Sequence, residues 1–83
     1  MLMANEFSVT SSGNQRTYLP LNGKALTLPD QVMVQRELTQ ISGIAGARVH
    51  VTPLQINVPK VDEADWEHLD AAIDAVLNKT TPR

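Results

Sequence analysis

The 83-residue chain contains no cysteine. Disulfides, thiolate nucleophiles and cysteine-based metal sites are therefore excluded, whereas either redox compartment is compatible with the sequence. Aromatic residues are scarce, with only Phe7, Tyr18 and Trp66, so the predicted core rests on aliphatic side chains. No apolar run approaches the ~18 residues of a transmembrane helix, and residues 1–5 lack the basic start and long apolar stretch of a signal peptide. We therefore expect a soluble, cytoplasmic protein without a membrane span.

Size and charge narrow the class of protein further. The hydrophobic share of 42% and the charged share of 19% are ordinary for a globular chain. The net charge of −2 provides no broad basic field for nucleic acid. A single domain this small has a thin stability margin, so pairing with a second copy would be one way to bury more apolar area. Six of the nine acidic residues fall in one C-terminal segment: Asp62, Glu63, Asp65, Glu67, Asp70 and Asp74.

The N-terminal part alternates apolar and polar residues in two short stretches. Strands are predicted over residues 6–10 and 17–21, in each of which the apolar side chains fall on one side. The small polar residues 11–15, around a glycine, predict a loop between them. Pro20 cannot donate to a strand ladder, which predicts an edge of the sheet at that point.

The dipeptide Asn22-Gly23 leaves two alternatives open. Between apolar stretches it is a strong signal for a hairpin turn, after which residues 24–27 would return as a third strand. Alternatively, residues 22–28 form a loop that leads into a helix.

A first helix is predicted from Thr27 to about Ile41. Thr27 can cap free backbone N–H groups, Pro29 suits the first turn, and Asp30 favours the positive end of the helix dipole. Gly43 is placed to end the helix in the left-handed conformation.

Two half-buried strands and a second helix follow. Residues 47–52 and 54–58 alternate apolar and polar side chains, with a tight connection at Pro53-Leu54. The last helix is predicted to be capped by Asp62, with Lys79 near its end as the macrodipole prefers. Its apolar stripe consists of Trp66, Leu69, Ile73, Val76 and Leu77.

These elements predict an α+β domain in which two helices pack on one face of a small antiparallel sheet. Their order is ferredoxin-like, β-α-β-β-α, with an extra N-terminal strand that could fill the edge left by the missing last strand. The domain is expected to cover residues 6–79, between a disordered N-terminus over 1–5 and a polar tail over 80–83.

Three stretches resemble heavy-metal-associated domains. Leu38-x-x-Ile41-x-Gly43-Ile44-x-x-Ala47-x-Val49-x-Val51 resembles their corner between the first helix and the second strand. Gln55-Ile56-Asn57-Val58 is similar to their third strand, and Leu69-Asp70-Ala71-Ala72-Ile73 to their second helix. The resemblance covers about residues 17–78 and implies a ferredoxin-like fold. The family's cysteine pair has no counterpart in residues 23–28, so soft-metal binding is not implied.

A second resemblance lies near the N-terminus. Val9-Thr10-Ser11-Ser12-Gly13, followed by Thr17-Tyr18-Leu19-Pro20, is similar to the start of swapped-hairpin antitoxin-type DNA-binding proteins. It implies a nucleic-acid-binding regulator that uses the N-terminal strands. Only Arg16 and Lys24 supply positive charge nearby.

Residues with chemical potential are few and scattered. His50 falls on the polar face of a strand and His68 on the last helix, so we interpret both as solvated side chains rather than metal ligands. Asp70 and Asp74 share a helix face at a spacing of four, on the polar side, and are expected to be solvated. The serines and glycines form neither a nucleophile motif nor a phosphate-binding loop. We therefore predict no enzyme activity and no cofactor.

The remaining candidates for function are surfaces. Trp66 is assigned to the core, whereas Val32 and Met33 fall off the main stripe of the first helix. They form either the edge of the core or an exposed apolar patch, which would indicate an interface. Candidate interface residues on the open sheet face are Arg48, His50, Thr52, Gln55 and Asn57. We predict a non-enzymatic interaction module that binds a protein partner or a second copy, through a sheet edge or the first helix. The alternatives are the nucleic-acid-binding regulator and a metal- or small-molecule-binding domain with ligands other than cysteine.

Overall fold

A computed structural model describes residues 7–21 and 25–80 of the chain. The elements are β1 (Phe7–Ser12), β2 (Gln15–Pro20), α1 (Leu28–Thr39), the short 3-10 helix η2 (Gly46–Arg48), β3 (His50–Thr52), β4 (Gln55–Pro59) and α2 (Trp66–Leu77). The predictions for residues 1–6, for Asn22-Gly23 and for the end of the tail, 81–83, lie outside the described residues. Residues 25–27 belong to no strand, so that part of the proposed third strand is not formed.

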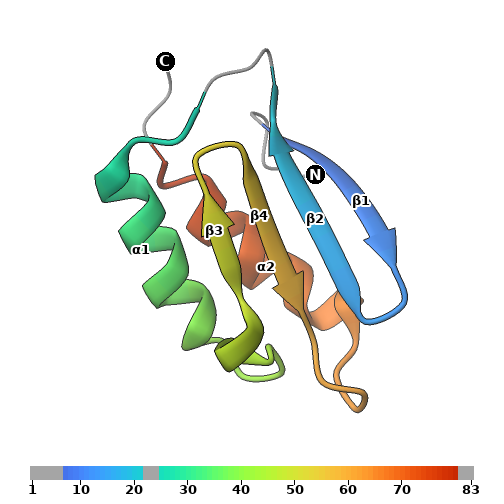
Figure 1. Ribbon diagram of the computed structural model, residues 1–83. Helices are drawn as coiled ribbons and strands as arrows, with labels where there is room; N and C mark the ends of the chain where they lie inside the picture. Colours follow the sequence, from blue (N-terminus) through green and yellow to red (C-terminus); the bar gives the residue numbers. More distant parts are fainter. Residues whose placement is uncertain (1–6, 22–24, 81–83) are drawn as a thin grey trace.

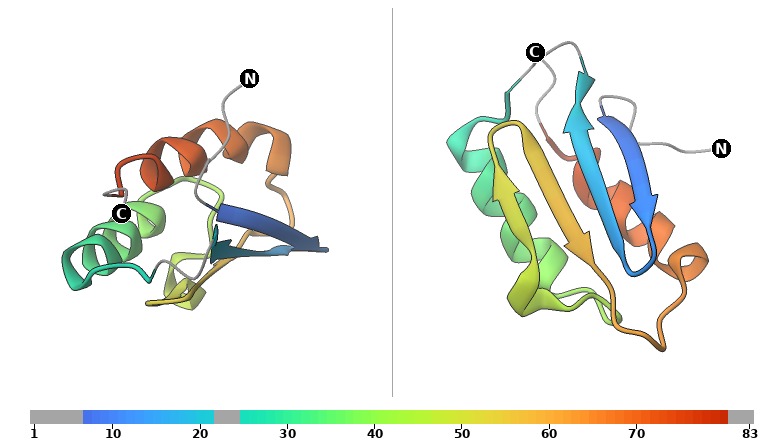
Figure 2. Two further views of the ribbon diagram at one scale, coloured as in Figure 1. Left: turned by 90° about the horizontal axis from the view of Figure 1, so that it is seen from above. Right: turned by 45° about the vertical axis from the view of Figure 1, so that its right-hand side comes forward.

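The four strands form one antiparallel sheet in the order β1-β2-β4-β3. Both helices lie on the same face of this sheet, with α1 alongside β3 (Figures 1 and 2). The predicted α+β class is confirmed, and the additional N-terminal strand takes the edge beside β2. The fully buried side chains between the layers are Tyr18, Leu38, Ile56, Ile73, Leu77, Val34 and Val58.

The predicted loop over 11–15 is wrong, because β1 and β2 continue through it to a tight hairpin. Ser12 pairs with Gln15 across the two-residue turn Gly13-Asn14. Gly13 has a φ of 60°, the left-handed value that such hairpin turns require at their first central residue. Small polar residues are therefore compatible with strand pairing when the turn between them is this short.

Pro20 lies in a central strand rather than at the edge that its missing N–H group predicted. It pairs with Phe7 on β1, whereas the register between β2 and β4 ends at Tyr18 opposite Ile56. Alternate residues of β2 turn their peptide groups toward β4, and Pro20 falls beyond the last of these pairs. The missing N–H group of Pro20 therefore costs the sheet no hydrogen bond.

Helix α1 begins as predicted and ends earlier. The Thr27 hydroxyl accepts a hydrogen bond from the Asp30 amide at 3.3 Å, and a proline occupies the first turn. The helix ends at Thr39 with Gln40 as its C-cap, before the predicted Ile41. Gly43 has the predicted left-handed φ, 98°, and lies beyond that cap.

The predicted strand over 47–52 is shorter in the structure. Backbone hydrogen bonds from Arg48 to Ala45 and from Val49 to Gly46 form η2, so β3 starts only at His50. Two of the predicted inward positions are correct, since Val49 is buried and Val51 is half-buried against the core, whereas Ala47, the third, lies in η2 and is exposed.

Helix α2 starts later than predicted, and Asp62 does not cap it. The N-cap is Asp65, and Asp62 instead accepts a hydrogen bond from the Asn14 amide in the β1–β2 turn. Residues 61–64 form a turn closed by the Ala64 amide and the Val61 carbonyl, which delays the helix. Lys79 pairs with Glu37 of α1 at 2.6 Å and links the two helices.

Candidate functional site

The open face of the sheet carries polar side chains that bond to one another. The Thr17 hydroxyl and the Gln55 amide both donate to the side-chain oxygen of Asn57, at 3.1 and 3.0 Å. His50 lies opposite Asn57, and Thr52 lies opposite Gln55, where its hydroxyl donates to the Gln55 carbonyl. These four predicted interface residues therefore share one face. Arg48, predicted on the same face, lies instead in η2 before the strand begins, and Met33 lies on α1, half-buried against the core.

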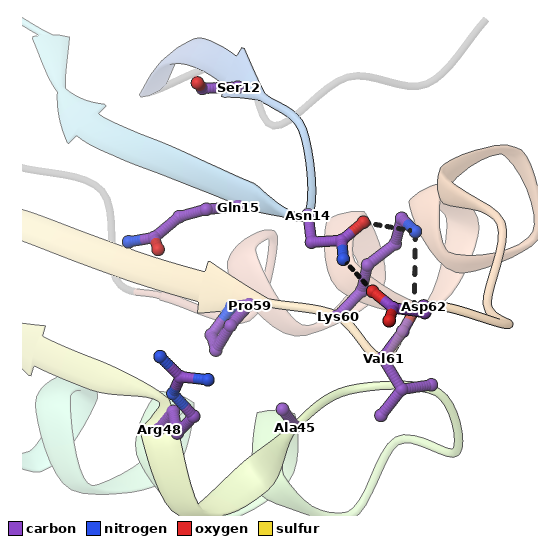
Figure 3. A pocket seen from close by; sticks show the side chains of 9 residues that line it. All are labelled: Ser12, Asn14, Gln15, Ala45, Arg48, Pro59, Lys60, Val61 and Asp62. Atoms are coloured by element: carbon purple, nitrogen blue, oxygen red, sulfur yellow. Dashed lines mark hydrogen bonds between the residues drawn. The ribbon is translucent and has the colours of Figure 1, made fainter.

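A polar pocket of about 470 Å³ lies where β2 begins and β4 ends (Figure 3). Asn14, Lys60 and Asp62 gather at one side of it and Arg48 at the other. Asn14 accepts from the Lys60 ammonium at 2.9 Å and donates to Asp62, which engages both charges. Arg48 forms no ion pair with the residues that the structure describes. Among the lining side chains there is no nucleophile with an adjacent base.

A second cluster joins the β1–β2 hairpin to α2 and centres on Arg16. Its guanidinium donates to the Ser11 hydroxyl at 2.7 Å and pairs with Asp70. It also lies over the Trp66 ring, 4.5 Å from the ring centroid. Trp66 is half-buried at the margin of the core, not within it as predicted. Asp70 is likewise an ion-pair partner, which corrects its predicted solvated state.

Burial and charge shift three pKa values in this cluster. Burial raises the pKa of Tyr18, and the hydrogen bond and positive charge of Arg16 partly oppose the rise. Burial also raises the pKa of Asp74, as does the neighbouring charge of Asp70, against the opposing charge of Arg16. For Arg16, burial lowers the pKa, but the contacts with Tyr18 and Asp70 outweigh it and the pKa is raised. Asp74 is therefore not the freely solvated carboxylate that its position on the helix predicted.

The outer edge of the sheet at β1 is not covered by any of the described residues. In the hairpin, Ser12, Thr10 and Ser8 exchange backbone hydrogen bonds with β2, because paired positions alternate outward from a two-residue turn. The intervening residues Phe7, Val9 and Ser11 therefore turn their N–H and C=O groups away from the sheet. Within residues 7–21 and 25–80, no group bonds to them.

The opposite edge, at β3, is covered. The outward carbonyl of Val49 accepts a hydrogen bond from the Gln35 side chain of α1 at 3.1 Å. The outward carbonyl of Pro53 accepts one from the Leu26 amide at 2.7 Å. Between these two points β3 is only three residues long, which leaves Val51 as its single outward position. Within the described residues, β1 thus presents three residues with outward peptide groups to another strand, whereas β3 presents only Val51.

Apolar side chains are also exposed near the start of α1. Leu28 is 70% exposed, Val32 54%, and a shallow groove beside them is lined further by Val51. Val32 matches the predicted exposed position on this helix. Nothing described in the structure lies on this groove.

The histidines are held apart. His50 is on the open face of the sheet, whereas His68 is on α2, which covers the other face, 3.8 Å from Asp65. Within the part of the chain that the structure describes, no group of His, Asp and Glu side chains is arranged to hold a metal ion. None of the helices described is both long and apolar enough to cross a membrane.

The fold and site together define a small α+β domain with a four-stranded antiparallel sheet, a polar open face and, among the described residues, an uncovered edge at β1. Comparison of the chain with models of protein families, with curated proteins and with solved structures gives no match in any of the three. The Arg16 cluster was missed by sequence reasoning, which predicted contact through a sheet edge without saying which edge. The signal for the edge is the composition of residues 7–12, which contain neither charge nor proline.

Proposed function

We propose that this protein is a non-enzymatic interaction module that binds a protein by adding a strand to the β1 edge of its sheet. The observation that carries the proposal is the contrast between the two edges. β1 is six residues long, with outward peptide groups that no residue of 7–21 or 25–80 binds, whereas the edge at β3 is covered by Gln35 and Leu26. Main-chain hydrogen bonds along an exposed edge are a recurrent mode of protein recognition.

The composition of β1 supports the same function. Edge strands usually carry charges, proline or a bulge that prevent other strands from pairing with them. Phe7–Ser12 has none of these charges or prolines and pairs with β2 in continuous register. A monomer that had no use for this edge would leave a site for nonspecific association unprotected.

The experiment compares the wild-type chain with Val9→Pro. Val9 turns its N–H group outward, so proline there removes an edge donor without removing a hydrogen bond to β2. Each protein is used as bait for affinity capture from a lysate, and its mass is measured by light scattering. We expect the wild type to retain a partner, or to self-associate, and the variant to lose that binding. A wild type that is monomeric and captures nothing, or captures the same proteins as the variant, would refute the proposal.

The alternative of nucleic-acid binding through the N-terminal strands has less support. β1 carries no cation, and Arg16, the only cation of β2, is engaged by Asp70 and Trp66. We further propose that the domain is a variant of the ferredoxin-like fold in which β1 takes the edge next to the strand that precedes α1, and that the protein acts in the cytoplasm. Absence of a salt-sensitive gel shift at low salt would exclude the nucleic-acid alternative.

A further inference from the structure

Resting on the proposed function, we infer that the strand added at the β1 edge is β1 of a second copy, antiparallel, with Val9 on the two-fold axis. The two copies would then share one continuous sheet. An antiparallel pair related by such an axis places both helical layers on the same side of that sheet. The contact is isologous, the arrangement found in most homodimers.

The register follows from which peptide groups are free. Only Phe7, Val9 and Ser11 present outward N–H and C=O groups within β1. Placing Val9 opposite Val9 of the second copy sets Phe7 opposite Ser11 of that copy, and Ser11 opposite Phe7. Every outward peptide group of β1 then has a partner. Moving the axis to Ser8 or Thr10 leaves the peptide group of Ser11 or Phe7, respectively, without a partner inside β1.

The side chains agree with this register. Val9 points toward the helical side but is 42% exposed, and directly opposed residues in a sheet share a face. Two copies would therefore cover each other's Val9. Ser8 would face Thr10 of the second copy on the open side, a pair of hydroxyls able to bond. Because β1 is uncharged, no like charges oppose each other across the axis. For the same reason, β1 offers no charge that would select a strand of a different, charged protein.

Substitution at Val9 tests the contact, with Leu19 as a matched control. Leu19 is 41% exposed, almost the same as Val9, but lies on β2 and faces away from the helices. Val9→Lys places two like charges opposite each other and should abolish the dimer, whereas Leu19→Lys should leave it intact. Val9→Pro removes a symmetric pair of backbone hydrogen bonds and should weaken the dimer by about tenfold to a hundredfold. The readout is the dissociation constant from sedimentation equilibrium, with circular dichroism to establish folding.

The absence of native cysteine allows a sharper test of the register. In an antiparallel hydrogen-bonded pair the Cα atoms are ~5.5 Å apart, within the range that a disulfide spans. Val9→Cys should therefore form a disulfide-linked dimer under mild oxidation. Thr10→Cys should not, because its counterpart lies two positions along the opposing strand, at a Cα separation of roughly 8 Å.

The outcomes separate this inference from the proposed function. Cross-linking through position 9 and sensitivity to Val9→Lys but not Leu19→Lys support the dimer. Cross-linking through position 10 alone would refute the register, and a dimer indifferent to every Val9 variant would refute the contact. A wild type that stays monomeric at about millimolar protein concentration refutes the dimer, because a Kd above that concentration corresponds to a binding free energy weaker than about −4 kcal/mol. If such a monomer still captures a protein that Val9→Pro loses, the proposed function stands. If Val9→Pro does not fold, the comparison of Val9→Lys with Leu19→Lys and that of Val9→Cys with Thr10→Cys decide.

Discussion

The indole Nε1 of Trp66 donates a hydrogen bond to the carbonyl oxygen of Gly13 at 2.9 Å. The bond joins the first residue of α2 to the turn of the β1–β2 hairpin, across more than half of the chain. The same ring receives Arg16 on its face. Trp66 therefore positions the hairpin that carries the open edge.

Replacing Trp66 by phenylalanine should isolate the contribution of that hydrogen bond. Phe keeps an aromatic face for Arg16 but has no N–H group, so we expect a loss of about 1 kcal/mol in the free energy of unfolding. Trp66→Ala should cost more, because the cation–π contact and the packing at the core margin are also lost. Urea denaturation followed by circular dichroism measures both, since the only tryptophan is removed. Equal costs for the two variants would contradict the role given to the bond.

The Arg16–Asp70 ion pair should show coupling in a double-mutant cycle. Arg16→Gln, Asp70→Asn and the double variant are compared by chemical denaturation. We expect a coupling energy of about 0.5–1.5 kcal/mol, because the Arg16 side chain is only 17% exposed while Asp70 is 45% exposed and more screened. Arg16→Gln should be the more destabilising single change, since it also releases Ser11 and Trp66. Additive effects of the two substitutions would show that the pair contributes nothing.

Asp74 should make the folded state more stable in acid than at neutral pH, whereas a carboxylate paired with a cation has the opposite effect. Its pKa is raised in the folded state by burial and by Asp70, so the folded state holds the proton more tightly than the unfolded state. The associated stability is present below the ordinary pKa of 3.8 and is lost as pH rises through the folded-state pKa. We therefore expect Asp74→Asn to stabilise the protein at neutral pH and to have no such advantage in acid.

The gain from Asp74→Asn should remain below about 1 kcal/mol, since the side chain is partly exposed to solvent. Urea titrations of wild type and variant at several pH values from acid to neutral measure it. Glu63→Gln, at an exposed position, controls for the removal of one negative charge. A gain of equal size at every pH would refute the assignment.

Gly43 and Gly13 should differ in their tolerance of alanine. Both have positive φ values, 98° and 60°, so a side chain is strained at either. At Gly43 a Cβ atom would also lie 3.1 Å from both Ala64 Cβ and Leu69 Cδ2, whereas at Gly13 it would meet open space. We expect Gly13→Ala to cost about 1 kcal/mol and Gly43→Ala clearly more, toward 3 kcal/mol. Thermal denaturation of the two variants provides the comparison.

Local signals in the sequence were sufficient for the existence of the two helices and of the paired strands. The buried face of β2 was not predicted from them, because its apolar alternation pointed to Leu19, which is exposed, whereas Tyr18 is the side chain buried in the core. Thr27, Pro29 and Asp30 act through neighbouring backbone groups, so the start of α1 could be predicted from them. The turn of the β1–β2 hairpin could not be predicted, because the chain reverses within two residues at Gly13 and the polar residues of the flanking strands resemble a loop. The start of α2 was misplaced because Asp62 bonds to Asn14, far away in the sequence.

The same limit applies to the candidate sites. The alternation of His50, Thr52, Gln55 and Asn57 correctly predicted a shared polar face, since strand periodicity alone determines it. The Arg16 cluster combines residues from β1, β2 and α2, and no spacing along the chain indicates it. The resemblance to heavy-metal-associated domains stays a prediction about the fold.

The hydrogen bonds from Gln35 and Leu26 onto the flank of β3 have a consequence for assembly. A sheet with two exposed flanks can recruit copies on both sides without end and grow into a fibre. With the β3 flank bound by its own Gln35 and Leu26, the β1 flank is the one left for a strand within the described residues, so an assembly through the proposed edge would stop at two copies.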